Sequence, residues 1–243
     1  MMSSTRDPRR SRRPRWLLAV GVLMLSVVAA ACVPAPPEPP PSNPENCEAP
    51  AGSVPGAVKI MGCSRLSVDQ IVAWFDSVTK APTWSYKASV PLRDLVGYYI
   101  DEGNAEGVRG DVAFAQAVVE TGYFSSDFTR DRNNFAGIGA IDSAPGNAAY
   151  FPDARTGVRA QIQHLRAYAD PAATTCAVPP LHNACVDPRF HLVSPKGKSP
   201  TWNGLAGTWA SSGDYGYSIV GQPGDKYKGV YTKMLEKYGL PLA

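Results

Sequence analysis

The chain has 243 residues, 44% of them hydrophobic and 19% charged, and a formal net charge of +3 at pH 7. That length allows one domain of ordinary size with additional segments. The positive charge is concentrated in residues 1–31, which carry six arginines and one aspartate, a net charge of +5. The remainder therefore has a net charge of −2, which excludes a nucleic-acid-binding role based on an overall basic chain.

Residues 1–31 are predicted to be a secretory signal peptide. A cationic start precedes the uncharged run 16–31, which ends in three alanines. This order of a basic region, a short apolar core and small residues is typical of an export signal. A spanning helix needs about twenty apolar residues, more than this run provides, so a permanent membrane anchor is the alternative that fits less well.

The five cysteines fit an exported protein. Cys32 follows the alanine run, where a lipoprotein signal places the residue that receives lipid; the alternative is cleavage elsewhere. Four cysteines then remain, enough for two disulfides in an oxidising compartment. Pairing nearest neighbours gives Cys47–Cys63 and Cys176–Cys185, and other connectivities stay open.

Residues 32–46 are predicted to be a tether. Seven prolines lie between Pro34 and Pro44, with few apolar residues beside them. Such a segment cannot form a core and favours extended polyproline geometry. At about 3 Å per residue, it would hold a domain roughly 30–40 Å from a lipid anchor.

Residues 47–243 are predicted to form one mainly helical domain. Ser67 and Gln70 form a capping box that begins a helix closed by Pro82. Apolar residues recurring every three or four positions predict further helices, at residues 92–101, 111–120, 156–169 and 226–238. The helix at residues 111–120 is apolar nearly all round, which indicates a helix inside the domain.

The remaining elements are a hairpin and a long irregular segment. Residues 133–139 are predicted to form one arm of a β-hairpin, residues 144–147 its turn and residues 148–151 its return. Residues 170–223 are predicted to be rich in loops. The expected fold class is mainly α with this small hairpin, a form of α+β.

Glu120 ends the apolar helix and is the candidate catalytic residue. Burying a carboxylate is costly, and burial raises the pKa of such a group. A carboxyl that keeps its proton near neutral pH can protonate a leaving glycosidic oxygen. The residues alone also allow a structural reading, an exposed glutamate paired with a nearby arginine.

Several motifs occur in a fixed order along the chain. Residues 106–124 place an Ala-Gln-Ala helix before Glu-Thr-Gly-Tyr-Phe, in which the glutamate is Glu120. Residues 133–140 read Asn-Asn-Phe-Ala-Gly-Ile-Gly-Ala. Three more stretches contribute, at residues 157–165, 187–190 and 204–210.

Together these motifs resemble the bacterial glucosaminidase family over roughly Leu66 to Leu240. The family comprises endo-β-N-acetylglucosaminidase-type peptidoglycan hydrolases with a lysozyme-like fold. The resemblance implies that Glu120 is the general acid and that a hairpin lies beside the active-site cleft. It implies sugar-binding roles for a further set of residues: Tyr123, Asn134, Phe135, Gly137 and Trp209.

The sequence departs from the family pattern at two points. Many members place a second glutamate in the hairpin, where this chain has only Asp142 and Asp153. Asp142 is the preferred second catalytic residue, Asp153 also fits a helix cap, and the acetamido oxygen of the sugar could act instead. The second departure is Trp209, where many members carry tyrosine; a tryptophan can still stack on a sugar ring.

The function expected from the sequence is an exported hydrolase that cleaves the glycan strand of peptidoglycan at N-acetylglucosamine. The alternatives are a lytic transglycosylase, which also needs one glutamate, and a non-catalytic wall-binding lipoprotein. The expected partners are the glycan strands and, through a lipid on Cys32, a membrane. No cofactor or metal is expected, because Cys176, Cys185 and the nearby histidines fit a disulfide better than a zinc site.

Overall fold

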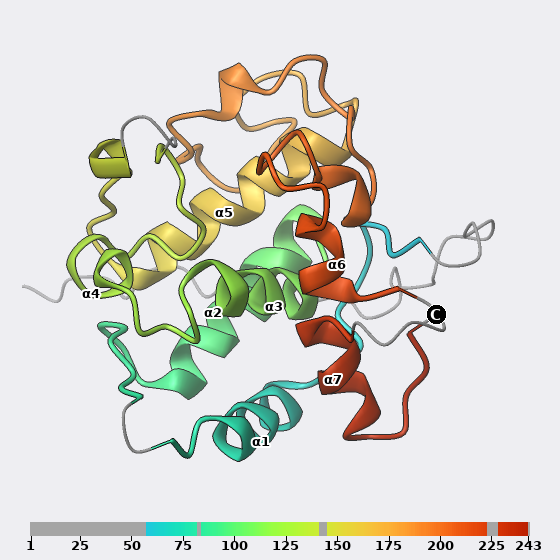
Figure 1. Ribbon diagram of the computed structural model, residues 1–243. Coiled ribbons are helices and arrows are strands. Elements are labelled where there is room, and N and C mark those ends of the chain that lie inside the picture. Colours follow the sequence, from blue (N-terminus) through green and yellow to red (C-terminus); the bar gives the residue numbers. More distant parts are fainter. Residues whose placement is uncertain (1–56, 82–83, 141–144, 223–227, 243) are drawn as a thin grey trace, which may run out of the picture. The chain divides into compact units, whose positions relative to one another are not determined.

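The computed structural model describes residues 57–81, 84–140, 145–222 and 228–242 (Figure 1). The predicted signal peptide, the predicted tether, Cys32 and Cys47 lie outside these ranges. So does Asp142. No helix within the described ranges is long and apolar enough to cross a membrane.

The described residues are mainly helical. In chain order their α-helices are α1 (Val68–Val78), α2 (Leu92–Glu106), α3 (Gly110–Glu120), α4 (Asp127–Arg132), α5 (Ala154–Ala169), α6 (Tyr215–Val220) and α7 (Val230–Glu236). Short 3₁₀ turns lie at Pro145–Asn147, Phe190–Leu192 and Asn203–Leu205.

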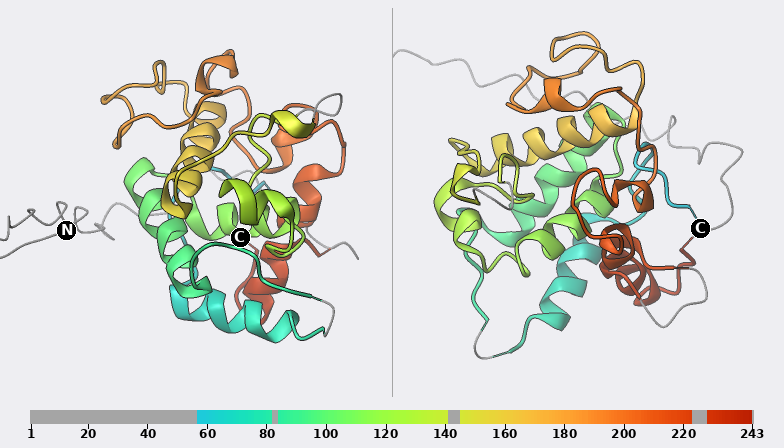
Figure 2. Two further views of the ribbon diagram at one scale, coloured as in Figure 1. Left: turned by 90° about the vertical axis from the view of Figure 1, so that its left-hand side faces the viewer. Right: turned by 45° about the horizontal axis from the view of Figure 1, so that its top comes forward.

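Helix α3 is the centre of this arrangement, as the two views of Figure 2 also show. It contacts α2, α5, α6 and α7. All its residues from Gly110 to Val118 are buried. The prediction of a helix enclosed by the domain is therefore confirmed, and its apolar composition is the cause, because a helix surrounded on all sides has no face to leave polar.

The first two helices begin as expected, but the second ends later. Ser67 and Gln70 form the predicted capping box of α1. Helix α2 continues past Gly103 to Glu106 and ends at Gly107, whose φ of 69° is left-handed. Gly103 instead permits a close approach of the next helix, because a Cβ there would lie 2.8 Å from the backbone nitrogen of Gly110.

The predicted β-hairpin is not seen among the described residues, which contain isolated bridges but no strand. One backbone hydrogen bond, from Ala149 N to Ile138 O at 2.7 Å, joins the two expected arms. The buried Asn134 side chain occupies further backbone groups there, donating to Ile138 O and Ala149 O and accepting from Ile138 N. Gly137 and Gly139, both with positive φ, also interrupt the extended backbone that a ladder requires.

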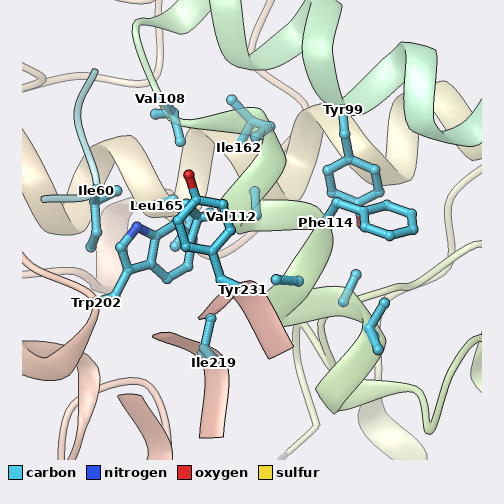
Figure 3. Close-up of a cluster of buried hydrophobic side chains, with 14 of the residues drawn as sticks. Ile60, Tyr99, Val108, Val112, Phe114, Ile162, Leu165, Trp202, Ile219 and Tyr231 are labelled. Carbon is cyan, nitrogen blue, oxygen red and sulfur yellow. The ribbon is translucent and has the colours of Figure 1, made fainter. Parts of the chain in front are cut away.

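The core joins distant parts of the chain. Figure 3 shows Tyr99 of α2 beside Phe114 of α3, and their rings meet edge to face with centroids 5.7 Å apart. Trp202, in the loop before α6, is fully buried, and its backbone nitrogen donates to Val58 O at 3.0 Å. The C-terminal third is thus part of the same core as α3. The contacts between α3 and α6 place residues 215–220 beside α3.

The segment after α5 folds back over that helix (orange in Figure 1). Gly197 N donates to Ala167 O, and the Glu106 carboxylate accepts from the backbone nitrogens of His182 and Asn183. Arg166 pairs with the same carboxylate at 2.6 Å. Charged groups of α2 and α5 therefore help to fix this segment, together with its buried apolar residues Leu181, Phe190 and Val193.

Candidate active site

Glu120 is the last residue of α3 and is partly buried. The chain leaves the helix through Gly122, Tyr123 and Phe124, which all have left-handed φ values, of 57°, 61° and 58°. Such values are unusual for aromatic residues. The Thr121 hydroxyl supports this turn by accepting from Phe124 N at 2.8 Å. The turn ends the helix abruptly, so that the Glu120 side chain lies at the edge of the core.

The environment of Glu120 favours its protonated form. Burial raises the pKa of the Glu120 carboxyl, and hydrogen bonds from Tyr215 and Trp209 offset part of that rise. The Tyr215 hydroxyl donates to Oε1. The second carboxyl oxygen, Oε2, faces Gly137, where a Cβ would lie 3.7 Å away. A carboxyl with one oxygen held and the other directed toward a glycine is suited to proton transfer.

A buried chain of hydrogen bonds determines how Tyr215 is used. The Gln116 amide nitrogen donates to the Tyr215 oxygen at 2.7 Å, so the phenol hydrogen is directed to Glu120. The Gln116 amide oxygen accepts from Gln161 of α5, whose own oxygen accepts from the Tyr99 hydroxyl at 2.6 Å. Four helices, α2, α5, α3 and α6, thus contribute to the orientation of one carboxyl.

A pocket of about 340 Å³ adjoins this carboxyl. Its lining includes Gly137 and Trp209, the two residues that also contact Glu120. A polar and aromatic wall of this pocket comes from α5 and from the segment that folds over it. It includes His164, Tyr168, Arg189 and Lys198.

Trp209 is held in place by neighbours in this wall. Its ring meets His164 edge to face, with centroids 5.0 Å apart, and contacts Tyr168 at 5.7 Å. His164 is fixed in turn by Asp187, whose carboxylate lies 2.7 Å from Nδ1. The tryptophan therefore presents a fixed aromatic surface between the pocket and the carboxyl.

Residues 96–236 match the model of the glucosaminidase family, described as mannosyl-glycoprotein endo-β-N-acetylglucosaminidase. The match covers more than half of the chain. The chain belongs to this family. The central helix, the turn after Glu120 and the wall with Trp209 all lie within the matched residues, so the glucosaminidase assignment includes the whole site described above.

Other comparisons give partial similarities. An uncharacterised protein of Borreliella burgdorferi is 40% identical over 115 residues, which are 46% of this chain and 52% of that protein. The chain thus spans about half the length of this curated relative.

Two solved structures share lower identity with this chain. Autolysin E of Staphylococcus aureus, in complex with the muropeptide NAM-L-Ala-D-iGlu, is 15% identical, with a TM-score of 0.44 over 75% of this chain and 72% of that one. The catalytic domain of the Listeria monocytogenes autolysin Auto is 14% identical, with a TM-score of 0.36 over 71% and 95% of the two chains. Family membership follows from the family model alone.

The residues expected to bind sugar occupy different depths. Gly137 and Trp209 line the pocket, and Tyr123 is partly exposed and stacks on Trp74 of α1. Asn134 and Phe135 are each 1% exposed. Asn134 organises the loop through its backbone contacts, and Phe135 packs on Phe124 in the core, so these two support the site from beneath.

The two candidates for a second carboxylate are now distinguishable. Asp153 caps α5 by accepting from the Thr156 nitrogen and hydroxyl, both at 2.8 Å, which confirms the helix-cap interpretation. Asp142 lies outside the described residues. Among the described residues, the pocket lining contains no carboxylate.

The cysteines follow the expected pattern where the structure describes both partners. Cys176 and Cys185 form a disulfide, with their Cα atoms 5.3 Å apart, so neither is a zinc ligand. Cys63 is disulfide-bonded, and its expected partner, Cys47, lies outside the described ranges. The predicted Cys47–Cys63 pairing stays a prediction.

Sequence reasoning did not identify the roles of Gln116 and His164 in the site, or the contact of Tyr215 with Glu120. A signal was available for Gln116, because an amide inside an apolar helix needs a buried partner. Tyr215 and His164 carry no such signal, since their positions depend on how α6 and α5 pack on α3.

Proposed function

We propose that this glucosaminidase-family chain is an exported peptidoglycan hydrolase that cleaves the glycan strand at N-acetylglucosamine, with Glu120 as general acid. The carrying observation is the partly buried carboxyl at the edge of the pocket, with its pKa raised by burial. The family match supports the glycosidase chemistry. A helical domain with its acid at the end of a central helix is also what a lysozyme-like fold would provide.

Export supports the choice of substrate. Residues 1–31 would direct secretion, and a lipid on Cys32 with the tether 32–46 would hold the domain 47–243 near a membrane and facing the wall; release as a free secreted form is the alternative. The polymer of N-acetylglucosamine that such an enzyme meets in a bacterial envelope is peptidoglycan.

The arrangement assigns a role to each contact of Glu120. Tyr215 donates to Oε1, which leaves Oε2 as the oxygen that carries the proton. Gly137 has no side chain to cover Oε2, so a glycosidic oxygen can approach there. Protonating that oxygen lets the bond to the sugar carbon break, with charge developing on the sugar ring. Trp209 offers a surface on which the ring can stack.

Stabilising the charged sugar requires a second group. We retain Asp142 as the proposed second carboxylate, since Asp153 is engaged as a helix cap. The acetamido oxygen of the substrate is the other source. A product that keeps the anomeric configuration would fit either a nucleophilic carboxylate or the acetamido group, whereas an inverted product would require a base that activates water.

A lytic transglycosylase is the second candidate. It is favoured because the described residues of the pocket lining include no carboxylate that could assist Glu120, which lies beside the pocket. Mass spectrometry of digested peptidoglycan separates the possibilities. We expect the purified protein to release fragments with reducing N-acetylglucosamine ends, and Glu120→Gln to lower their yield at least a thousandfold, since it removes the proton donor. Anhydromuramic ends would indicate the transglycosylase. Strand binding without release by either protein would indicate a wall-binding role.

A further inference from the structure

The pocket beside Glu120 has a cationic wall. Arg189 and Lys198 both line it, on the segment that folds back over α5, and Trp209 lines the same pocket. Arg189 is partly exposed and Lys198 is exposed, so both charges can reach a ligand in the cleft. Neither side chain has a role in the proton transfer proposed above.

These two charges lack the carboxylate partners that neighbouring cations have. Arg159 and Arg166 are paired with the buried carboxylates of Glu102 and Glu106, at 2.8 and 2.6 Å. Among the described residues, no ion pair involves Arg189 or Lys198.

Asp187, an acid beside this wall, does not neutralise it. The Asp187 carboxylate is fully buried and is engaged by the His164 ring at 2.7 Å and by the backbone nitrogen of Arg189 at 2.9 Å. Lys198 lies over the Tyr168 ring, 5.2 Å from its centroid. Among the described residues, this wall thus presents two positive charges against one buried negative charge, so the net charge of the wall is positive.

We propose that this wall binds carboxylates of the peptide stems that peptidoglycan carries, and that Arg189 and Lys198 make the enzyme prefer glycan with charged stems. The proposal rests on the proposed function. The sugars of the intact polymer are neutral, so its negative charge lies on the stems. Each stem is attached to the sugar adjoining an N-acetylglucosamine, which places it next to the bond that Glu120 would cleave.

The chemistry of the two cations suits that ligand. A guanidinium donates two parallel hydrogen bonds to a carboxylate, while an ammonium acts as a mobile point charge. Together they would hold a stem without requiring one fixed peptide conformation. Trp209 and Tyr168 would contribute apolar surface to the same pocket.

The test compares two forms of one substrate. Both forms are soluble glycan strands free of teichoic acid. In one form the stem carboxylates are free, and in the other they have been converted to neutral amides. We expect the unmodified protein to cleave the charged strands with a kcat/KM about tenfold higher, the effect of one hydrogen bond to a charged group. The double variant Arg189→Ala/Lys198→Ala should cleave both at the lower rate.

A charge-matched control is available in α7 and at the residue that follows it. Lys233→Ala/Lys237→Ala removes two exposed lysines that lie outside the pocket lining, and should keep the full preference. Thermal unfolding of each variant shows whether the fold is intact. A preference that persists in the Arg189/Lys198 variant would overturn the inference and leave the glycosidase intact.

Binding separates the failure of the inference from the failure of the function. In a protein that also carries Glu120→Gln, we expect fluorescence anisotropy to show that amidated strands bind about tenfold more weakly than charged strands. This difference in affinity should disappear when Arg189→Ala/Lys198→Ala is added. Preferential binding without any turnover by the active form would reject the hydrolase and keep the stem-binding wall. Two results would show that Arg189 and Lys198 do not bind stem carboxylates. One is equal binding of both kinds of strand, and the other is a preference seen only with cell-wall material that retains teichoic acid.

Discussion

Tyr215 sets the protonation behaviour of Glu120 more directly than any other single residue, because its hydroxyl donates to the carboxyl and is itself oriented by Gln116. Burial and the neighbouring Glu120 charge raise the pKa of Tyr215 well above its ordinary value, so the phenol keeps its proton. The hydrogen bond stabilises the charged form of Glu120 and lowers the pKa that burial has raised.

Replacing Tyr215 by phenylalanine should therefore move the pH–rate profile. Without the donor, the pKa of Glu120 rises further. A general acid must be protonated, so the basic limb of kcat/KM should shift to higher pH. Unfolding should become easier by about 1–3 kcal/mol, because the Gln116 amide loses its buried acceptor. Rate profiles and urea unfolding measure the two effects.

Tyr217→Phe provides the matched control for this change. Tyr217 lies in the same helix, α6, and is partly exposed. It should leave both the basic limb and the unfolding free energy close to those of the unmodified protein. A basic limb that stays in place in Tyr215→Phe would mean that Glu120 is not the titrating acid, or that Tyr215 does not act on it.

At the scale of elements, the contact between α2 and α3 depends on glycine. A Cβ on Gly103 would lie 2.7 Å from Val108 O and 2.8 Å from Gly110 N, and both are backbone atoms that cannot easily move. Gly97 lies in the same helix and has no neighbouring atom within 4 Å of such a Cβ. A substitution at Gly103 therefore tests the need for a close approach of the two backbones, while the same substitution at Gly97 tests only the effect of glycine on helix stability.

Gly103→Ala and Gly97→Ala should change stability in opposite directions. The first should lower the unfolding free energy by about 2 kcal/mol or more, since the backbones of α2 and α3 must separate. The second should raise it by about 0.5–1 kcal/mol, because alanine is the better helix former. Urea unfolding measures both. A Gly103→Ala protein as stable as its Gly97→Ala counterpart would contradict the close packing described here.

The same helices show what the sequence could and could not predict. The capping box at Ser67 and the apolar run of α3 are local signals, and both predictions are confirmed. The predicted helix at residues 92–101 ends too early, because a glycine that permits a close approach, such as Gly103, and a glycine that ends a helix look alike in sequence. Helix α6 has six residues, fewer than two turns, too few for a periodic pattern to reveal.

The site also contains residues that the sequence could predict and residues that it could not. Glu120, Gly137 and Trp209 were predicted from motifs and come together in the structure. The expected hairpin failed because one side chain, Asn134, takes over backbone bonds that a ladder would use. Arg189 and Lys198 reach the pocket only through the folding of residues 170–205 over α5, a tertiary event that no local pattern encodes.

On the scale of the described domain, two buried carboxylates of α2 hold the pocket wall to the helices. Glu102 is fully buried and is bonded by Arg155 at 2.6 Å, Arg159 at 2.8 Å and Asn183 at 3.1 Å. Burial alone would raise the pKa of Glu102, but the hydrogen bonds and charges of the two arginines outweigh it, so the pKa lies below its ordinary value of 4.5.

Glu102→Gln should therefore destabilise the protein in a pH-dependent way. A lowered pKa means that the carboxylate stabilises the fold fully above pH 4.5 and loses that effect as the pH falls further, through its lower folded-state value. At pH 7 the variant should unfold about 2–3 kcal/mol more easily, because two arginines lose their charged partner. The loss stays moderate because these arginines are partly exposed and keep some hydration. Below pH 4.5 the difference in unfolding free energy should narrow, since the unmodified protein then loses the same charge.

Asp69→Asn, which breaks the exposed pair with Arg93, should change the unfolding free energy little at either pH. Chemical unfolding at several pH values measures this. A gap that is constant from pH 7 to pH 3 would mean that Glu102 acts through shape and hydrogen bonding alone, and that its charge does not hold the wall in place.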